Sequence, residues 1–229
     1  MIGFKNSYYL PRLILSNLIL ISLISLVGCS EKNLDLSKKY YKEGLVHFNK
    51  KEYPQALDLF MKSSDLVDNP STCDMIGLTY KGIGDHNNAI LWFKKAIETD
   101  PLYWITYINI GDIHNEDSNY EEAITWYVKG KEINSRVELP YMKLCDIFLK
   151  QGEVEKAIDE CKDAIEKLAP YTSEPHFRLG DIYADKGLYD KAITEWKAAK
   201  SDPYYDRIYK EYDPVEKRIQ NIEPFLKKQ

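Results

Sequence analysis

Alanine recurs in one context five times at nearly constant spacing, and this repeat limits the possible folds more than any other feature of the chain. The local contexts include YPQA, YEEA and YDKA, and the alanines are Ala56, Ala89, Ala123, Ala157 and Ala192. Their separations are 33, 34, 34 and 35 residues. Such a period is typical of stacked small units, in which each unit contacts only its neighbours.

Three further series keep the same register as the alanines. Small residues lie twelve positions upstream, at Gly44, Gly77, Gly111, Cys145 and Gly180. Bulky residues, with one cysteine, lie four positions downstream, at Phe60, Phe93, Tyr127, Cys161 and Trp196. Small residues lie seven positions downstream, at Ser63, Ala96, Gly130, Ala164 and Ala199. The series therefore predict two helices per unit that cross closely at the small residues, with an aromatic side chain filling the space beside the crossing.

Glycine and proline mark the predicted ends of these helices. Gly84, Gly152 and Gly187 fall at the joint between the two helices of a unit, where glycine readily forms the turn. Most units close with a proline, which cannot continue a helical hydrogen-bond ladder: Pro70, Pro101, Pro170 and Pro203.

The pattern resembles the tetratricopeptide repeat, a 34-residue helix–turn–helix unit. The resemblance implies an all-α fold, a right-handed superhelical solenoid of about five repeats over residues 37–204. The expected repeats are 37–69, 70–103, 104–137, 138–172 and 173–204. Residues 205–229 are expected to form a C-terminal capping helical segment, in which Asp213-Pro214 begins a helix and Pro224 ends it.

The N-terminus has the organisation of an export signal. Lys5 and Arg12 precede an uncharged apolar run over residues 13–27, which is short for a membrane-spanning helix of about 20 residues. The run ends in Leu26-Val27-Gly28-Cys29. Residues 1–29 resemble a bacterial lipoprotein signal peptide with its lipobox. An uncleaved transmembrane anchor is the alternative.

The lipoprotein resemblance implies cleavage before Cys29 and attachment of a diacylglyceryl group to its sulfur, with acyl chains such as palmitate. Several chains on one residue give long-lived membrane attachment. Residues 29–36 would then be the lipidated cysteine and a short tether. An Asp directly after the lipidated cysteine would resemble an inner-membrane retention signal, but this chain has Ser30 at that position. The expected location is therefore the bacterial cell envelope, with the outer membrane favoured.

Composition and motifs argue against several other functions. The net charge is −5, and the chain without its basic leader carries −7, so a nucleic-acid partner is not expected. No HExxH, GxSxG, P-loop or GxGxxG motif occurs, and all four histidines align with aromatic repeat positions. We therefore predict no catalytic residues, cofactor, metal or small-molecule substrate. Cys145 and Cys161 share one predicted crossing and form either a disulfide or, as we favour, two buried thiols.

The tetratricopeptide resemblance also places a concave groove along the first helix of each repeat. The implied partner-binding residues are Tyr41, Leu45, Phe48, Leu78, Ile108, Asp112, Asn115, Met142, Asp146, Leu149, Phe177 and Asp181. Ile108, Met142 and Phe177 would form an apolar row, and Asp112, Asp146 and Asp181 an acidic row. We hypothesise that the groove binds a protein segment with apolar anchors and basic donors. The alternative is a solvated acidic face on a protein that binds elsewhere.

These expectations together indicate a membrane-anchored scaffold or adaptor that binds an envelope protein or peptide, and that could assist assembly of an outer-membrane or secretion complex. Two other functions stay open. The chain could be a structural envelope lipoprotein that self-associates without a client, or an accessory subunit that presents an enzyme.

Overall fold

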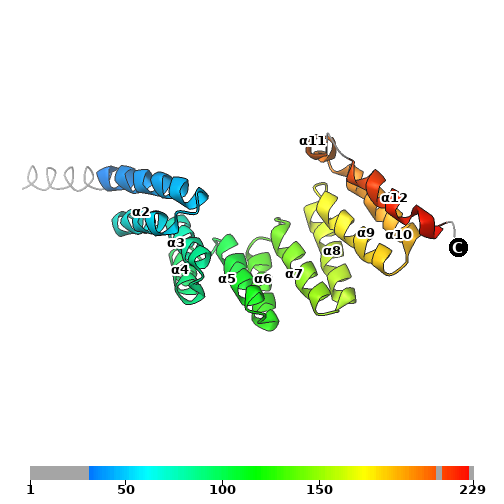
Figure 1. The fold of residues 1–229 in the computed structure, drawn as a ribbon, viewed down its shortest axis with the longest axis horizontal. Helices are drawn as coiled ribbons and strands as arrows, with labels where there is room; N and C mark the ends of the chain where they lie inside the picture. Colours follow the sequence, from blue (N-terminus) through cyan, green and yellow to red (C-terminus); the bar gives the residue numbers. More distant parts are fainter. Residues whose placement is uncertain (1–30, 210–212, 227–229) are drawn as a thin grey trace, which may run out of the picture. The chain divides into compact units, whose positions relative to one another are not determined.

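The computed structural model describes residues 31–209 and 213–226, and all regular elements within these ranges are helical. An N-terminal helix covers residues 31–49. It is followed by α2 (Tyr53–Leu66), α3 (Pro70–Ile83), α4 (His86–Thr99), α5 (Ile105–Glu116), α6 (Tyr120–Ile133), α7 (Leu139–Lys150), α8 (Val154–Leu168), α9 (Ser173–Asp185), α10 (Tyr189–Ala198), a 3-10 turn (Ala199–Ser201), α11 (Tyr205–Ile208) and α12 (Pro214–Leu226). Successive helices pair as helical hairpins (Figure 1), which confirms the expected all-α repeat fold.

The chain divides into two compact units, Met1–Asp100 (unit 1) and Pro101–Gln229 (unit 2). Cys29, the expected signal peptide over residues 1–28 and the first residues of the expected tether lie outside the described part. None of the described helices is both long enough and apolar enough to cross a membrane.

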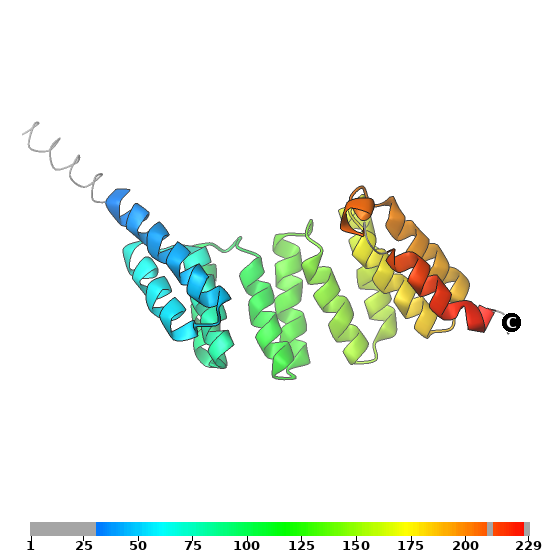
Figure 2. The same cartoon turned by 45° about the horizontal axis from the view of Figure 1, so that its top comes forward.

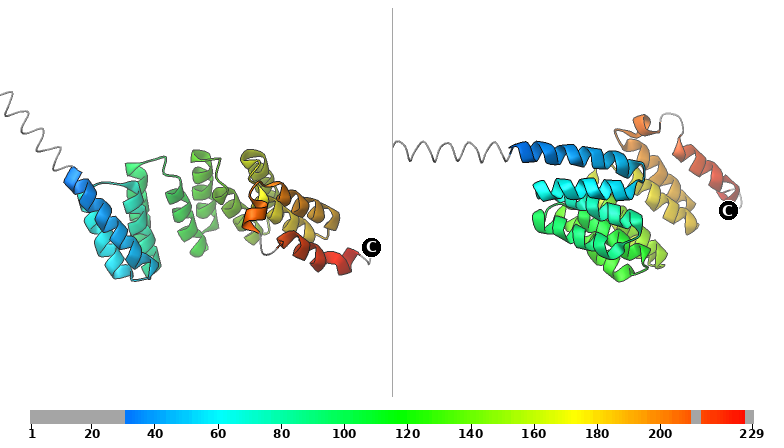
Figure 3. Two further views of the ribbon diagram at one scale, coloured as in Figure 1. Left: turned by 90° about the horizontal axis from the view of Figure 1, so that it is seen from above. Right: turned by 60° about the vertical axis from the view of Figure 1, so that its left-hand side comes forward.

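Unit 1 contains the N-terminal helix and α2–α4. The N-terminal helix lies beside α2 (Figure 3). Ser37 is buried there, and its hydroxyl donates to the Ser63 carbonyl oxygen at 3.0 Å. Residues 31–36 were expected to be a tether, but they are helical and continue directly into the first repeat. The physical reason is that no proline or glycine interrupts residues 31–43, so nothing in this stretch breaks the helix.

Unit 2 contains three helical hairpins, α5–α6, α7–α8 and α9–α10, followed by α11 and α12. Its central core includes Tyr127, Tyr141, Leu144 and Ile147, all at most 1% exposed. In Figure 2, α12 lies along the last hairpin. Val215 and Ile222 of α12 join a second core around Trp196, so this helix covers the apolar face that the last hairpin would otherwise expose.

The predicted helix crossings are confirmed. A Cβ added at Gly44, Gly77 or Gly111 would approach an aromatic ring of the partner helix to 2.7, 2.5 and 2.5 Å; the rings belong to Phe60, Phe93 and Tyr127. Gly180 meets Trp196 in the same way. Each glycine therefore provides the space into which the aromatic ring sixteen residues later packs.

The turns between the helices of a repeat adopt a left-handed backbone conformation in all five hairpins. Gly84, Gly152 and Gly187 have φ of 89°, 75° and 73°, as their positions predicted. Lys51 and Ser118 take this place in the first and third repeats, with φ of 61° and 62°. The shared conformation keeps the hairpin geometry although two repeats lack the glycine.

The C-terminal helix differs from expectation at Pro224, which was predicted to end it. α12 continues through Pro224 to Leu226. Phe225 stacks on Tyr189 with ring centroids 5.7 Å apart, and Leu226 packs against the core around Trp196. These apolar contacts stabilise the last turn, although Pro224 cannot donate a backbone hydrogen bond.

Candidate partner-binding surface

The first helices of unit 2 present a face on which each acidic residue of the predicted row pairs with a cation from the next first helix. Asp112 of α5 lies 2.8 Å from the Lys143 Nζ of α7. Asp146 of α7 lies 3.3 Å from Arg178 Nη1 of α9. Asp181 of α9 accepts hydrogen bonds from Arg218 of α12, at 2.8 Å from Nε and 3.1 Å from Nη2. Because α12 supplies the last cation, it occupies the role of a further first helix.

Two of the three carboxylates also accept a hydrogen bond from an aromatic side chain of their own repeat. The Tyr127 hydroxyl donates to Asp112 at 2.7 Å, and Trp196 Nε1 donates to Asp181 at 2.9 Å. Burial of Tyr127 and the neighbouring Asp112 carboxylate raise the pKa of the tyrosine hydroxyl well above its ordinary value. Asp146 has no such partner because Cys161 stands at the aromatic position of its repeat. The carboxylates thus join helices within and between repeats.

Comparisons with known proteins agree with this architecture. Two tetratricopeptide repeat models match the chain, one at residues 70–101 and 106–136 and the other at residues 147–206, and together they span just over half of it. The chain belongs to the tetratricopeptide-repeat family. It is 30% identical over 139 residues to the uncharacterized protein ycf37 of Guillardia theta, an alignment spanning 49% of this chain and 78% of that protein.

Two further relatives extend the comparison. The chain is 28% identical over 87 residues to the photosystem I assembly protein Ycf3 of Prochlorococcus marinus. This alignment spans 36% of this chain and half of that protein. A crystal structure of MamA superposes with a TM-score of 0.58 at 25% identity, covering 72% of this chain and 97% of that one. Tetratricopeptide repeats mediate protein–protein interaction, and nothing in these relatives points to an enzyme.

The apolar row proposed for the tetratricopeptide groove is buried, which corrects the expected surface. Ile108, Met142 and Phe177 are 1%, 6% and 2% exposed. The reason is visible at Gly130 on α6: a Cβ there would lie 2.6 Å from Ile108 Cδ1, so the glycine provides the space that Ile108 fills. These three side chains are almost fully buried and stabilise the repeats, so they offer a partner almost no surface in this conformation.

The remaining predicted residues of unit 2 stay accessible to different degrees. Asp112 is 20% exposed, whereas Asp146 and Asp181 are 45% and 43% exposed. Asn115 accepts a hydrogen bond from Lys150 at 3.1 Å, and Leu149 is half-buried beside the central core. The accessible part of the predicted set in unit 2 is therefore Asn115, Asp146, Leu149 and Asp181, which we call the first-helix face.

The predicted residues of unit 1 are half-buried and pack on its own core. Tyr41, Leu45 and Phe48 contact the cluster formed by Ala56, Phe60 and Ile76. The Tyr41 hydroxyl lies 2.8 Å from the Ser71 hydroxyl. Leu78 is likewise half-buried on α3. Their partner-binding role stays a prediction.

The crossing of the fourth repeat brings two cysteines together. Cys145 and Cys161 are both 0% exposed, are free thiols, and have sulfur atoms 3.2 Å apart. They occupy the places of glycine and aromatic residue in the other crossings. Within residues 31–209 and 213–226, no three metal-ligating side chains come together.

Sequence reasoning missed the basic partners of the acidic row. Lys143, Arg178 and Arg218 follow their aspartates by 31, 32 and 37 residues, close to one repeat length. That spacing was the available signal, because residues one repeat apart lie on adjacent helices of a stack. An acidic row accompanied by a basic row at this offset indicates ion pairs within the protein.

Proposed function

We propose that this protein is a lipid-anchored adaptor of the bacterial cell envelope. Its tetratricopeptide repeats bind a segment of another envelope protein and assist assembly of an outer-membrane or secretion complex. The observation that carries this proposal is a repeat domain of a protein-binding family that directly follows a lipobox-like Leu26-Val27-Gly28-Cys29.

The anchoring part of the proposal rests on the sequence of the leader. A charged start, an apolar run of 15 residues and a cysteine directly after Gly28 are the features that lipoprotein processing needs. Lipid on Cys29 would attach the chain two residues before the N-terminal helix, whose described part begins at residue 31. A rigid helix that starts so close to the anchor would keep unit 1 near the bilayer.

The adaptor part rests on the family and on the character of the first-helix face. Ycf3, a relative over part of the chain, is named as an assembly protein, and we transfer only that class of role. The two carboxylates of the face, Asp146 and Asp181, are each paired with a cation of the same chain. We therefore expect a partner segment that binds mainly by apolar contact at Leu149 and by hydrogen bonds, with weak dependence on salt.

The first experiment is a pull-down from membranes that contain the full chain, beside a Cys29→Ala form. Envelope proteins recovered in stoichiometric amount with the anchored form alone would support an adaptor that acts at the membrane. Recovery of the chain without other proteins, with a mass in solution that rises with concentration, would favour self-association and contradict the adaptor role. Mass spectrometry of Cys29 tests the lipid independently.

The surface is tested with a matched pair of variants in the same pull-down. Leu149→Glu places a charge on the first-helix face, whereas Leu188→Glu changes a residue at the start of α10 that is 40% exposed. We expect the Leu149 variant alone to lose the partner, with helical content unchanged by circular dichroism. Equal recovery with both variants would exclude this face as the binding site.

A further inference from the structure

The third and fifth repeats connect their two helices by a hydrogen bond beside the crossing. The Tyr127 hydroxyl donates to Asp112 at 2.7 Å, and Trp196 Nε1 donates to Asp181 at 2.9 Å. In each repeat the donor is on the second helix, and the acceptor is on the first helix fifteen residues earlier. The aromatic side chain therefore has two roles, because its ring fills the crossing and its O–H or N–H links the helices.

The sequence couples these two positions in every repeat except the fourth. Where the first helix has a leucine, Leu45 or Leu78, the aromatic residue is a phenylalanine, which has no donor group. Where the first helix has an aspartate, in the third and fifth repeats, the aromatic residue is a tyrosine or a tryptophan. The fourth repeat has the aspartate, Asp146, but the residue fifteen positions later is Cys161, whose thiol is a weak donor. This repeat therefore lacks the usual donor of the connection.

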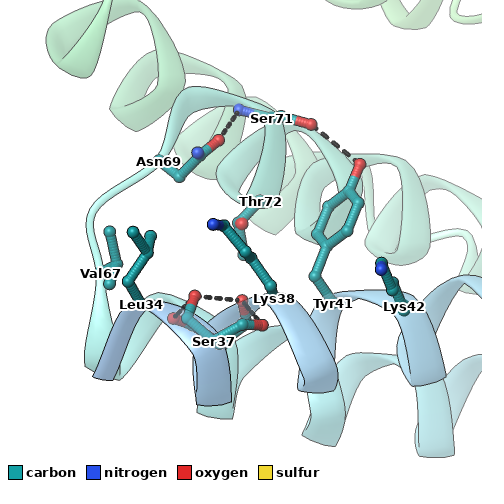
Figure 4. Close-up of a pocket in the computed structure, with 10 residues that line it drawn as sticks. Leu34, Ser37, Lys38, Tyr41, Lys42, Val67, Asn69, Ser71 and Thr72 are labelled. Carbon is teal, nitrogen blue, oxygen red and sulfur yellow. Dashed lines mark hydrogen bonds between the residues drawn. The ribbon is translucent and has the colours of Figure 1, made fainter. Parts of the chain in front are cut away.

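The first repeat shows that a pair of small side chains can connect two helices as well. The Ser37 hydroxyl donates to the Ser63 carbonyl oxygen at 3.0 Å, and the Ser63 hydroxyl donates to the Ser37 carbonyl oxygen at 2.9 Å. Figure 4 shows Ser37 with these bonds at the edge of a pocket that both serines line. Both residues are buried, at 5% and 0% exposed, so this connection is shielded from water.

The fourth repeat brings two thiols together at the place where its donor is missing. Cys145 of α7 and Cys161 of α8 have sulfur atoms 3.2 Å apart, and both residues are 0% exposed. The S–S bond of a disulfide is about 2 Å long, so the two sulfur atoms need to approach each other by only about 1 Å to reach it.

The closed crossing protects the two thiols from reaction. The hydrogen bond with Cys145 and burial raise the pKa of the Cys161 thiol well above its ordinary value, and the reactive form of cysteine is the thiolate. An external disulfide therefore has to reach the pair before the repeat closes during folding, or while the repeat opens transiently. Exported proteins meet such disulfide donors outside the cytoplasm.

We propose that Cys145 and Cys161 form a disulfide that connects the two helices of the fourth repeat. The oxidant is a small-molecule or protein disulfide of an oxidising compartment. One cysteine thiolate attacks this donor disulfide, forms a mixed disulfide and releases one thiol. The second cysteine thiolate attacks the mixed disulfide, closes the bond between the cysteines and releases the second thiol, so the donor takes up two electrons and two protons. Formation in the cell rests on the export that we propose for this chain, whereas formation in solution does not.

The disulfide makes the rigidity of the fourth repeat depend on its redox state. In the reduced chain two thiols fill the crossing without the usual link, and in the oxidised chain a covalent bond joins α7 to α8. Asp146 and Leu149 of the first-helix face lie on α7, so oxidation holds this part of the face more rigidly. A partner then loses less conformational entropy on binding. This last step rests on the proposed adaptor function.

Peptide mapping tests the bond in the full chain, purified from membranes while free thiols are blocked. Lys150 and Lys156 lie between the two cysteines, so trypsin places the cysteines on separate peptides that only a disulfide holds together. We expect this linked pair, and we expect dithiothreitol to separate it. Cys73, a buried free thiol of unit 1, is the internal control and should be blocked as a single thiol.

Hydrogen exchange tests the effect of the bond on the repeat. Amides of α7 and α8 should exchange at least about tenfold more slowly in the oxidised chain than in the chain reduced with dithiothreitol. Amides of α3 and α4 in unit 1 should differ less than about twofold between the two states, because the bond lies in another unit.

Two double variants separate the missing connection from a general loosening of the crossing. Cys145→Gly with Cys161→Tyr gives the fourth repeat the pair of the third, with a hydroxyl placed to donate to Asp146. Its α7 and α8 amides should exchange more slowly than those of the reduced chain, whether or not dithiothreitol is present. Cys145→Ala with Cys161→Ala adds no connection, so it should exchange at least as fast as the reduced chain in both conditions. Circular dichroism checks that each variant is folded.

Three results would overturn the proposal: two free thiols even after incubation with glutathione disulfide, equal exchange of α7 and α8 in the oxidised and reduced chains, or a double-alanine variant that exchanges as slowly as the oxidised chain. A pair that oxidises in solution but is free in the membrane fraction would overturn formation in the cell, and with it the export of this domain. None of these measurements needs a partner, so their failure is distinguishable from failure of the adaptor function.

Discussion

The hydrogen bond between Tyr127 and Asp112 provides the sharpest test of whether the acidic row serves the fold. Tyr127 is 0% exposed, and its hydroxyl donates to a carboxylate that is 20% exposed and also paired with Lys143. A hydrogen bond to a charged group contributes about 1.5–3 kcal/mol. Because Asp112 keeps Lys143 and some contact with water in a Tyr127→Phe variant, we expect the lower end, about 1.5 kcal/mol.

The effect should be measurable as both a thermal and a local change. For a chain of this size, about 1.5 kcal/mol lowers the thermal midpoint by roughly 3–6 °C. Repeat arrays can unfold in parts, so hydrogen exchange of the α5 and α6 amides is the better assay. Tyr183→Phe is the control, because its hydroxyl forms no hydrogen bond within residues 31–209 and 213–226, and it should leave exchange in α5 and α6 unchanged.

A double-mutant cycle with Asp112→Asn decides whether the cost belongs to this pair. We expect Tyr127→Phe to cost less in the Asp112→Asn background, with an interaction energy of about 1 kcal/mol, since a neutral acceptor forms a weaker hydrogen bond. An unchanged free energy of unfolding for Tyr127→Phe, or equal costs in both backgrounds, would refute the structural role of Asp112. The acidic row would then again be available as a recognition surface.

Three further predictions concern other parts of the repeat domain. Gly77→Ala should destabilise unit 1 by about 1–3 kcal/mol, because its Cβ would lie 2.5 Å from the Phe93 ring, and chemical denaturation measures this. Asp213 has its pKa held at about 2: burial opposes this, but hydrogen bonds from Lys200, Tyr205 and the Val215 N–H outweigh it. This lowered pKa adds stability that is present above about pH 4 and lost as the pH falls toward 2, and after allowance for solvent screening it amounts to about 1 kcal/mol. Hydrogen exchange of the α12 amides should therefore become faster in that pH window, and Asp213→Asn should abolish this pH dependence. Glutathione disulfide should oxidise Cys145 and Cys161 to a disulfide, which mass spectrometry would detect as the loss of two hydrogen atoms. The disulfide closes a loop of about 15 residues and should stabilise unit 2 by about 3 kcal/mol. A Cys145→Ala variant should show neither change.

The repeat fold could be predicted from the sequence because its signals are local and recur five times. The spacing of Gly111, Ala123 and Tyr127 defines which helices cross and where, and the structure repeats this crossing in other repeats. Pro224 shows the limit of local signals. Its ring predicts a helix end, but the contacts of Phe225 and Leu226 with the last hairpin are tertiary and outweigh it.

The accessible surface was harder to predict because a residue's place on a helix does not fix its burial. Ile108 occupies a groove position of the family, yet the small Gly130 on the paired helix allows it to sink into the core. The sequence contained a sign of this, since small residues recur at the Gly130 position in every repeat, including Ala164 and Ala199. A small residue on one helix indicates burial of the large residue opposite it.

The ion pairs of the acidic row show how a residue that recurs in every repeat can be interpreted in other repeat proteins. A side chain that recurs once per repeat lies on the first helix of each repeat, next to the corresponding helix of the neighbouring repeat. It can therefore either bind an external segment or join neighbouring repeats. The position of opposite charges separates these cases: Lys143 and Arg178 recur one repeat after Asp112 and Asp146, and the structure pairs them. The same geometry explains why α12 can close the array. Arg218 gives Asp181 the cation that a sixth repeat would supply, so the last carboxylate is paired although no repeat follows it in the described chain.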